Sequence, residues 1–191
     1  MKYPVLFSLI QHFGPIPETE WEALENVSTI KTVPKNTKTL QIGEMATDIG
    51  MIITGSVRFY YQDEEGKEFN HAFMFEGSLF SGYPSLVTKK PSRFCIETME
   101  ETTYLCIPWH EFEKFYDRHP SWDRLGRKVL EWNYLNKMER EALLLVGNAY
   151  SKYQRALELY PQLKERIPQY HLASFIGITP SALNRILKKK T

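Results

Sequence analysis

The chain has 191 residues, of which 42% are hydrophobic and 25% are charged, and this composition excludes a disordered or collagen-like protein. Its apolar runs fall far short of the ~18 residues that a membrane-spanning helix needs, so we expect no such helix and no membrane partner. The net charge is +1, but residues 149–191 carry eight basic and two acidic side chains, whereas residues 1–148 carry a net charge of −5. This asymmetry indicates an end that faces a polyanion, or else a lysine-rich tail that keeps the protein soluble.

The pattern of apolar residues divides the chain into three parts. Residues 1 to about 25 favour helix, interrupted at Pro15 and Pro17. From about Ser28 to Pro108 the apolar period is close to two, and beyond Trp109 it is helical again. Turn signals separate the short runs, which is typical of a β-sandwich or barrel. The strands predicted in this way are 30–33, 39–42, 50–53, 57–61, 69–74, 93–98 and 103–107.

The longest helix signal begins at Pro120-Ser121 and runs to Gly147-Asn148. We predict Ser121 as the N-cap, with Asp123 in the first turn. Apolar residues recur at three- and four-residue steps between Leu125 and Leu145. Such a stripe packs on its own domain or pairs with a second copy of the chain, and both alternatives stay open at this point.

Residues 169–188 show the pattern of a helix-turn-helix. Ala173 is small enough for a second helix to approach the first, and Gly177 tolerates the positive φ of the turn. Thr179 is a natural N-cap, and Pro180 suits the first position of the second helix. The buried faces would come from Leu172, Ile176, Ile178, Leu183 and Ile186.

The second of these helices would lie in the major groove of DNA. Arg185 can bind a guanine edge and Asn184 an adenine edge. The hydroxyl groups near the helix start suit phosphate, and the terminal lysines suit salt-dependent backbone contacts. A capped α-hairpin with a solvated lysine tail is the alternative. The predicted DNA-binding residues are Thr179, Ser181, Asn184, Arg185, Lys188 and Lys189.

The order of β-region, long helix and helix-turn-helix resembles the bacterial cyclic-AMP receptor protein/fumarate–nitrate regulator (Crp/Fnr) superfamily of transcription factors. The resemblance rests on Ile42-Gly43-Glu44, the stretch Met51–Tyr60, Glu65-Gly66-Lys67-Glu68 and the stretch Glu76–Phe80. It implies an α+β fold: a double-stranded β-helix, or jelly-roll-like β-roll, with flanking helices, then a long helix and a small helix-turn-helix domain. The implied domains are a sensor (1–120), a dimerisation helix (121–148) and a DNA-binding domain (149–191).

The resemblance also implies partners and a location. Members of the superfamily are cytoplasmic homodimers whose long helices pair as in a coiled coil, and whose recognition helices enter major grooves one DNA turn apart. Duplex DNA, a second copy of the chain and RNA polymerase are therefore the expected partners. The candidate interface residues are Leu125, Val129, Trp132, Leu135 and Met138.

Relatives that bind cyclic nucleotides use a glutamate for the ribose hydroxyl and an Arg-Ser pair for the phosphate. Here the glutamate aligns with Gly82, and Ser92-Arg93-Phe94 replaces the Arg-Ser pair. A displacement by one residue turns a strand side chain to the opposite face, so we do not expect cyclic AMP as the effector. Another small effector, or none, is expected instead. The candidate pocket residues are Gly77, Ser81, Gly82, Tyr83, Ser92 and Arg93.

No cofactor, metal or catalytic activity is expected from the sequence. The two cysteines, Cys95 and Cys106, cannot hold an iron–sulfur cluster or a zinc ion on their own. The five histidines lack the spacing of metal ligands, and no phosphate loop or nucleophile motif is present. A reduced cytoplasmic protein fits the two cysteines.

The leading hypothesis is therefore a homodimeric DNA-binding regulator whose hinge near Gly147-Asn148 responds to an effector or partner. Residues 161–168 leave room for only a short wing, or none, before the helix-turn-helix. Two other functions stay open: a ligand-binding module whose helical tail binds another protein, and a metal-dependent β-roll enzyme.

Overall fold

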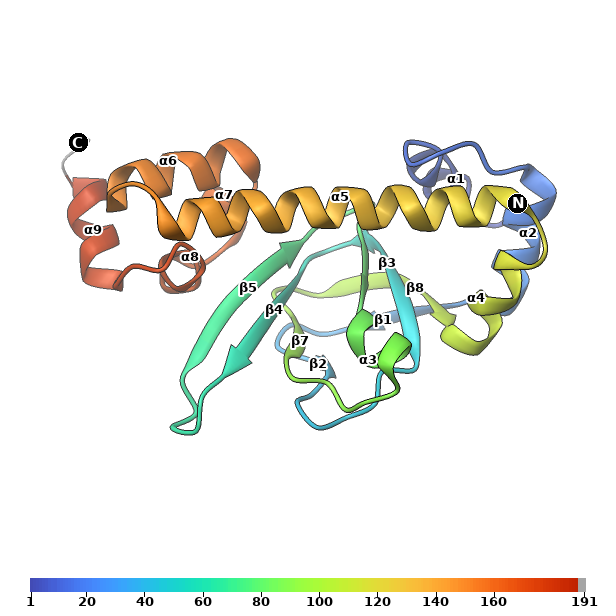
Figure 1. Ribbon diagram of the computed structural model, residues 1–191, viewed down its shortest axis with the longest axis horizontal. Helices are drawn as coiled ribbons and strands as arrows, with labels where there is room; N and C mark the ends of the chain where they lie inside the picture. The colour runs from blue at the N-terminus through green and yellow to red at the C-terminus, as the bar shows by residue number, and fades with distance from the viewer. Residues whose placement is uncertain (189–191) are drawn as a thin grey trace. The chain divides into compact units, whose positions relative to one another are not determined.

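The computed structural model describes residues 1–188 (Figure 1). Two compact units make up the chain. The first comprises Met1–Tyr60 and Phe73–Glu131, and the second comprises Tyr61–Ala72 and the chain from Trp132 onward. These units divide the chain differently from the three predicted segments, because a piece of the β-region, 61–72, clusters with the C-terminal helices.

The first unit contains two antiparallel sheets, although residues 61–72 of the second sheet belong to the second unit. One has the order β1-β8-β3-β6, formed by Thr29–Val33, Thr102–Pro108, Asp48–Thr54 and Leu79–Ser81. The other has the order β2-β7-β4-β5, formed by Lys38–Leu40, Cys95–Thr98, Val57–Gln62 and Glu68–Met74. The predicted α+β class with a β-roll is confirmed. Strand β6 was not predicted, because three residues are too few to show a period of two.

Helices cover one face of the first sheet. They are α1 (Pro4–Ile10), α2 (Glu18–Val27), α4 (Trp109–Tyr116) and the start of α5, while α3 (Tyr83–Thr88) follows β6. The strand residues Ile49, Met51, Leu105 and Ile107 share one buried cluster with Trp21, Phe112, Phe115, Trp122 and Leu125. Alternate strand residues point to opposite faces, so the remaining positions of β3 and β8 face the interior of the roll.

Helix α5 spans Pro120–Leu145 and is one continuous helix in Figure 1. The predicted N-cap at Ser121 is wrong, because the helix already includes Pro120. The His119 ring accepts a hydrogen bond from the Ser121 backbone N–H at 3.2 Å, so the histidine supplies the acceptor that a cap residue would provide. Asp123 lies in the first turn as predicted.

The second unit continues after α5 with α6 (Ala149–Leu159), α7 (Leu163–Arg166), α8 (Gln169–Phe175) and α9 (Pro180–Lys188). Gly147 separates α5 from α6 with φ +95°, and a Cβ at this position would overlap the Ser151 hydroxyl. Asn148 caps α6 by accepting from the Tyr150 and Ser151 N–H groups, each at 3.0 Å.

The short helix α7 stands where a wing would lie, and the residues described between α6 and α8 include no strand. No helix within residues 1–188 is long and apolar enough to cross a membrane.

Candidate nucleic-acid interface and effector pocket

The connection between α8 and α9 has the geometry that the sequence predicts. Gly177 takes φ +70°, and the Ile178 N–H donates to the Ala173 carbonyl at 3.0 Å. Thr179 caps α9, since its Oγ1 accepts from the Ala182 N–H at 3.2 Å. Ala173 and Leu183 are fully buried where the helices meet. The helix-turn-helix prediction is therefore confirmed as local structure.

Helix α9 exposes a row of polar side chains. Ser181, Asn184, Arg185 and Lys188 line a surface groove of about 390 Å³, and Thr179 is also exposed at the start of the helix. These five residues are brought together as predicted, although their contact with DNA stays a prediction. Lys189, the sixth predicted residue, lies outside the described residues.

Aromatic rings fill much of the β-roll interior. Gly50 gives the ring of Phe80 its space, because a Cβ at Gly50 would overlap that ring. Phe80 also packs edge-on against Tyr104, with 5.1 Å between ring centroids. Phe94 is buried against Phe59, with their centroids 5.7 Å apart.

A cavity of about 170 Å³ remains between β2, β3 and β6. This volume is below the ~300–1,000 Å³ of pockets that hold drug-sized ligands. Of the six predicted pocket residues, Ser81 and Gly82 line the cavity, and Gly77, Tyr83, Ser92 and Arg93 are not among its lining residues. Both polar and apolar residues line the cavity: Thr39, Leu40, Glu44, Met45, Ala46, Thr47, Asp48, Phe80, Ser81, Gly82 and Ile96.

The remaining predicted pocket residues have structural contacts or face solvent. Tyr83 packs edge-on against Trp109, and the buried Ser92 hydroxyl donates to the Phe94 carbonyl at 2.8 Å. Arg93 is exposed in the bend just before β7 (Cys95–Thr98), whereas its neighbour Phe94 is buried. Gly77 takes φ +78° in the turn between β5 and β6.

Gly82 is tightly packed. A Cβ at this position would lie 2.5 Å from Leu40 Cδ2 and 2.8 Å from Ala46 Cβ. A glutamate therefore does not fit here without displacing the β2 segment. The position that the resemblance aligns with the ribose-binding glutamate is therefore closely packed, and the expectation that cyclic AMP is not the effector stays a prediction.

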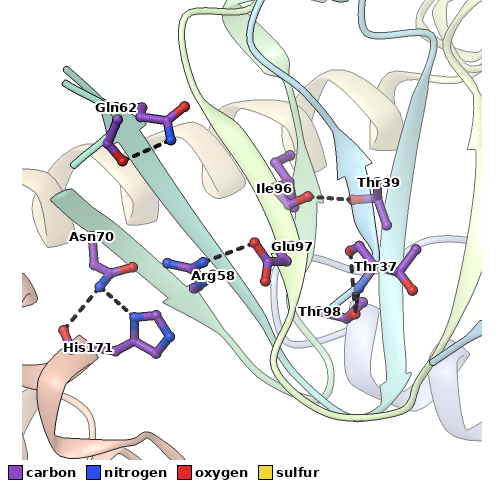
Figure 2. A network of polar contacts seen from close by, with 10 residues as sticks. Thr37, Thr39, Arg58, Gln62, Asn70, Ile96, Glu97, Thr98 and His171 are labelled. Atoms are coloured by element: carbon purple, nitrogen blue, oxygen red, sulfur yellow. Dashed lines mark hydrogen bonds and ion pairs between the residues drawn. The ribbon is translucent and has the colours of Figure 1, made fainter. Parts of the chain in front are cut away.

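A buried ion pair crosses the second sheet and was not found by sequence reasoning. Arg58 on β4 lies opposite Glu97 on β7, and Arg58 Nη2 is 2.9 Å from Glu97 Oε2 (Figure 2). The guanidinium also lies 4.0 Å from the centroid of the Tyr60 ring. Burial, with Cys95 and Glu97 nearby, raises the pKa of Tyr60, so this phenol is un-ionised at neutral pH. The feature of the sequence that could have indicated this ion pair was a lone arginine inside an apolar strand.

One face of α5 is exposed within the second unit. Leu135, Met138 and Leu145 are 63%, 46% and 76% exposed, and Ala142 between them is also exposed. Their spacing of three, four and three residues is that of a coiled-coil seam. We name Leu135, Met138, Ala142 and Leu145 the α5 seam. The opposite side of this helix includes the buried Leu143.

The predicted interface residues differ in their surroundings. Leu125 is 2% exposed in the core of the first unit, and the partly buried Val129 packs against the same core, so both side chains stabilise their own chain and their predicted role in an interface stays a prediction. Trp132, Leu135 and Met138 are exposed and remain candidates. Leu125 and Leu135 occupy the same apolar stripe, which is why the sequence could not separate them.

His71 on β5 is partly buried in the second unit. Burial, with Arg140 and Lys137 nearby, lowers the pKa of its imidazole to about 4. The ring is therefore neutral at physiological pH. In the part of the chain that the structure describes, no three His, Cys, Asp or Glu side chains form a group that could hold a metal ion.

Comparison with known proteins gives the same architecture. Residues 30–119 match the family model of the cyclic nucleotide-binding domain. FixK2 from Bradyrhizobium japonicum superimposes with a TM-score of 0.74 at 18% identity, covering 85% of this chain and 84% of that protein. The chain has the Crp/Fnr fold. The resemblance found in the sequence is thus confirmed at the level of the fold.

Two further structures with the Crp/Fnr fold match over most of the chain. CLP from Xanthomonas campestris, a c-di-GMP-responsive global regulator, has a TM-score of 0.73 at 17% identity, with 91% of each chain covered. A protein from Eubacterium rectale described as a Crp/Fnr-family transcriptional regulator has a TM-score of 0.73 at 13% identity, covering 93% of this chain and 87% of that one. No curated protein matches the sequence.

Proposed function

We propose that the protein is a DNA-binding transcriptional regulator that acts as a homodimer in the cytoplasm, with RNA polymerase as a further partner. The observation that carries the proposal is the polar row on α9, from Ser181 to Lys188, exposed on a helix-turn-helix that buries Leu172, Ile176 and Leu183 but only partly buries Ile178 and Ile186. The matched structures include proteins named as regulators, which supports a regulator over an enzyme or a module that binds only protein.

The chemistry of this row fits a major groove. A guanidinium can donate two hydrogen bonds to the O6 and N7 atoms of guanine, and a carboxamide can pair with the edge of adenine. Arg185 and Asn184 supply these groups. The net charge of +6 on residues 149–191 adds sequence-independent attraction to phosphate.

Replacing Arg185 by alanine should weaken binding to duplexes of about 30 bp that wild-type protein selects from a random pool. We expect a loss of roughly 5- to 150-fold, because one bidentate base contact contributes ~1–3 kcal/mol. The preference at one base position should relax as well. Gel-shift titration of the selected and single-base-substituted duplexes measures both effects.

Lys188→Ala is the matched control on the same helix. A phosphate contact carries no base preference, so this variant should weaken all duplexes alike and reduce the slope of log affinity against log salt by about 1. If Arg185→Ala binds the selected duplex as tightly as wild type does, the base-reading role of Arg185 is wrong.

A homodimer would place two α9 helices on one duplex. We propose that the α5 seam pairs with its copy, because an apolar stripe at heptad spacing is otherwise left in water. An effector or partner would then act by favouring one geometry of the Gly147-Asn148 hinge over another. The difference between its affinities for the two geometries sets how far it can shift the equilibrium between them.

Any effector of the β-roll should be smaller than a cyclic nucleotide. The Phe80 and Phe94 rings occupy the interior, Gly82 is packed against Leu40, and about 170 Å³ of cavity remains. We expect cyclic AMP at millimolar concentration to leave the thermal unfolding midpoint unchanged, because only a ligand that binds the native state raises it. A saturable rise of several degrees would contradict this prediction.

A further inference from the structure

The outer part of the β4–β5 hairpin, residues 61–72, belongs to the same compact unit as the helix-turn-helix. Strand β5 is an edge strand of its sheet. The backbone groups along an edge have no neighbouring strand and need other partners when they are buried. Around Asn70, helices α5 and α8 supply these partners.

Asn70 is 1% exposed and bonds through its side chain and both backbone polar groups. Its Nδ2 donates to His171 Nδ1 at 3.0 Å and to the His171 carbonyl at 3.2 Å (Figure 2). Its backbone N–H donates to Ser174 Oγ at 3.0 Å, and its carbonyl accepts from Arg140 Nη2 at 2.9 Å. We name these contacts, with the Ser174 hydroxyl donating to the Glu68 carbonyl, the α8 clamp.

The clamp contacts α8, the first helix of the helix-turn-helix, and leaves the polar row of the second helix, α9, exposed. His171 and Ser174 lie on α8, whereas the polar row on α9 remains exposed. The turn between the helices is also held, since a Cβ at Gly177 would lie 3.0 Å from Leu144 Cδ2 on α5. The hairpin therefore restrains the orientation of α9 without covering it.

We propose that the α8 clamp fixes the orientation of the helix-turn-helix and thereby pre-organises it for DNA. Rotation about Gly147-Asn148 breaks the hydrogen bonds that join Asn70 and Glu68 to α8, which opposes the rotation. A restrained helix loses less conformational freedom on binding, so the clamp strengthens binding. The restraint itself does not depend on the proposed function, whereas the effect of the restraint on DNA affinity rests on that function.

Asn70→Ala in the full chain tests the restraint without DNA. Hydrogen exchange followed by mass spectrometry should show amides of α8 exchanging about 10-fold faster, because the variant removes two buried hydrogen bonds to this helix. Ser174→Ala should accelerate the same amides. Gln62→Ala is the matched control, since the Gln62 side chain donates to the Gly66 carbonyl within the hairpin at 3.0 Å, and it should leave α8 unchanged.

Affinity for the selected duplex of about 30 bp is the second readout. Asn70→Ala should weaken binding about 10-fold, and Gln62→Ala should not. Unchanged exchange in α8 overturns the clamp itself, whatever the affinity. Faster exchange with equal or tighter binding overturns its pre-organising role. If wild-type protein binds no duplex, the proposed function fails, the pre-organising role fails with it, and exchange alone decides the restraint.

Discussion

Replacing Glu97 by alanine should lower the free energy of unfolding by about 3–5 kcal/mol. The Arg58–Glu97 pair is buried, with side chains 5% and 11% exposed, so the variant removes a buried carboxylate that lies 2.9 Å from the guanidinium. The adjacent Tyr60 ring attracts this cation but cannot replace a carboxylate. Urea unfolding of wild type and variant at equal protein concentration measures the loss.

Two comparisons separate loss of the pair from loss of packing. Arg58→Met combined with Glu97→Leu removes both charges and should recover most of the stability, because apolar residues of similar volume avoid the desolvation cost. Glu131→Ala breaks the exposed pair with Arg127 and should cause no measurable loss. If Glu97→Ala unfolds at the same urea concentration as wild type, the buried pair contributes no net stability.

Replacing Leu135 by glutamate should convert the proposed dimer to monomers and weaken DNA binding at least 100-fold. The substitution places two like charges in an apolar seam, where burial disfavours each of them. Loss of the dimer removes the gain from two linked recognition helices, which is worth ~10²–10⁴ in affinity. Sedimentation velocity measures the first effect, and titration of the selected duplex measures the second.

Lys137→Glu is the control for this experiment. It places a glutamate two residues further along α5, at an exposed position outside the seam, and it should leave the dimer intact. A Leu135→Glu protein that still sediments as a dimer would show that the two chains meet on another surface.

Local signals in the sequence were sufficient for most strands, for the long helix and for the helix-turn-helix, but not for β6. Gly177 at the turn and Thr179 at the cap act on backbone groups within three residues of themselves, so their effect can be predicted without knowing the fold. The alternation in residues 57–61 likewise reflects the strand itself. The polar row on α9 followed from helical spacing once that helix was located.

Packing between distant segments decided the remaining features. Arg58 and Glu97 are 39 residues apart, and Asn70 and His171 are 101 apart, so no local pattern pairs them. Leu125 and Leu135 share one stripe, and only the three-dimensional arrangement buries the first and exposes the second. The close packing at Gly82 depends on Leu40, which is 42 positions earlier in the chain. The sequence by itself determined conformations that a few neighbouring dihedral angles set, whereas the tertiary structure decided which side chains lose water, because burial depends on segments that only folding brings together.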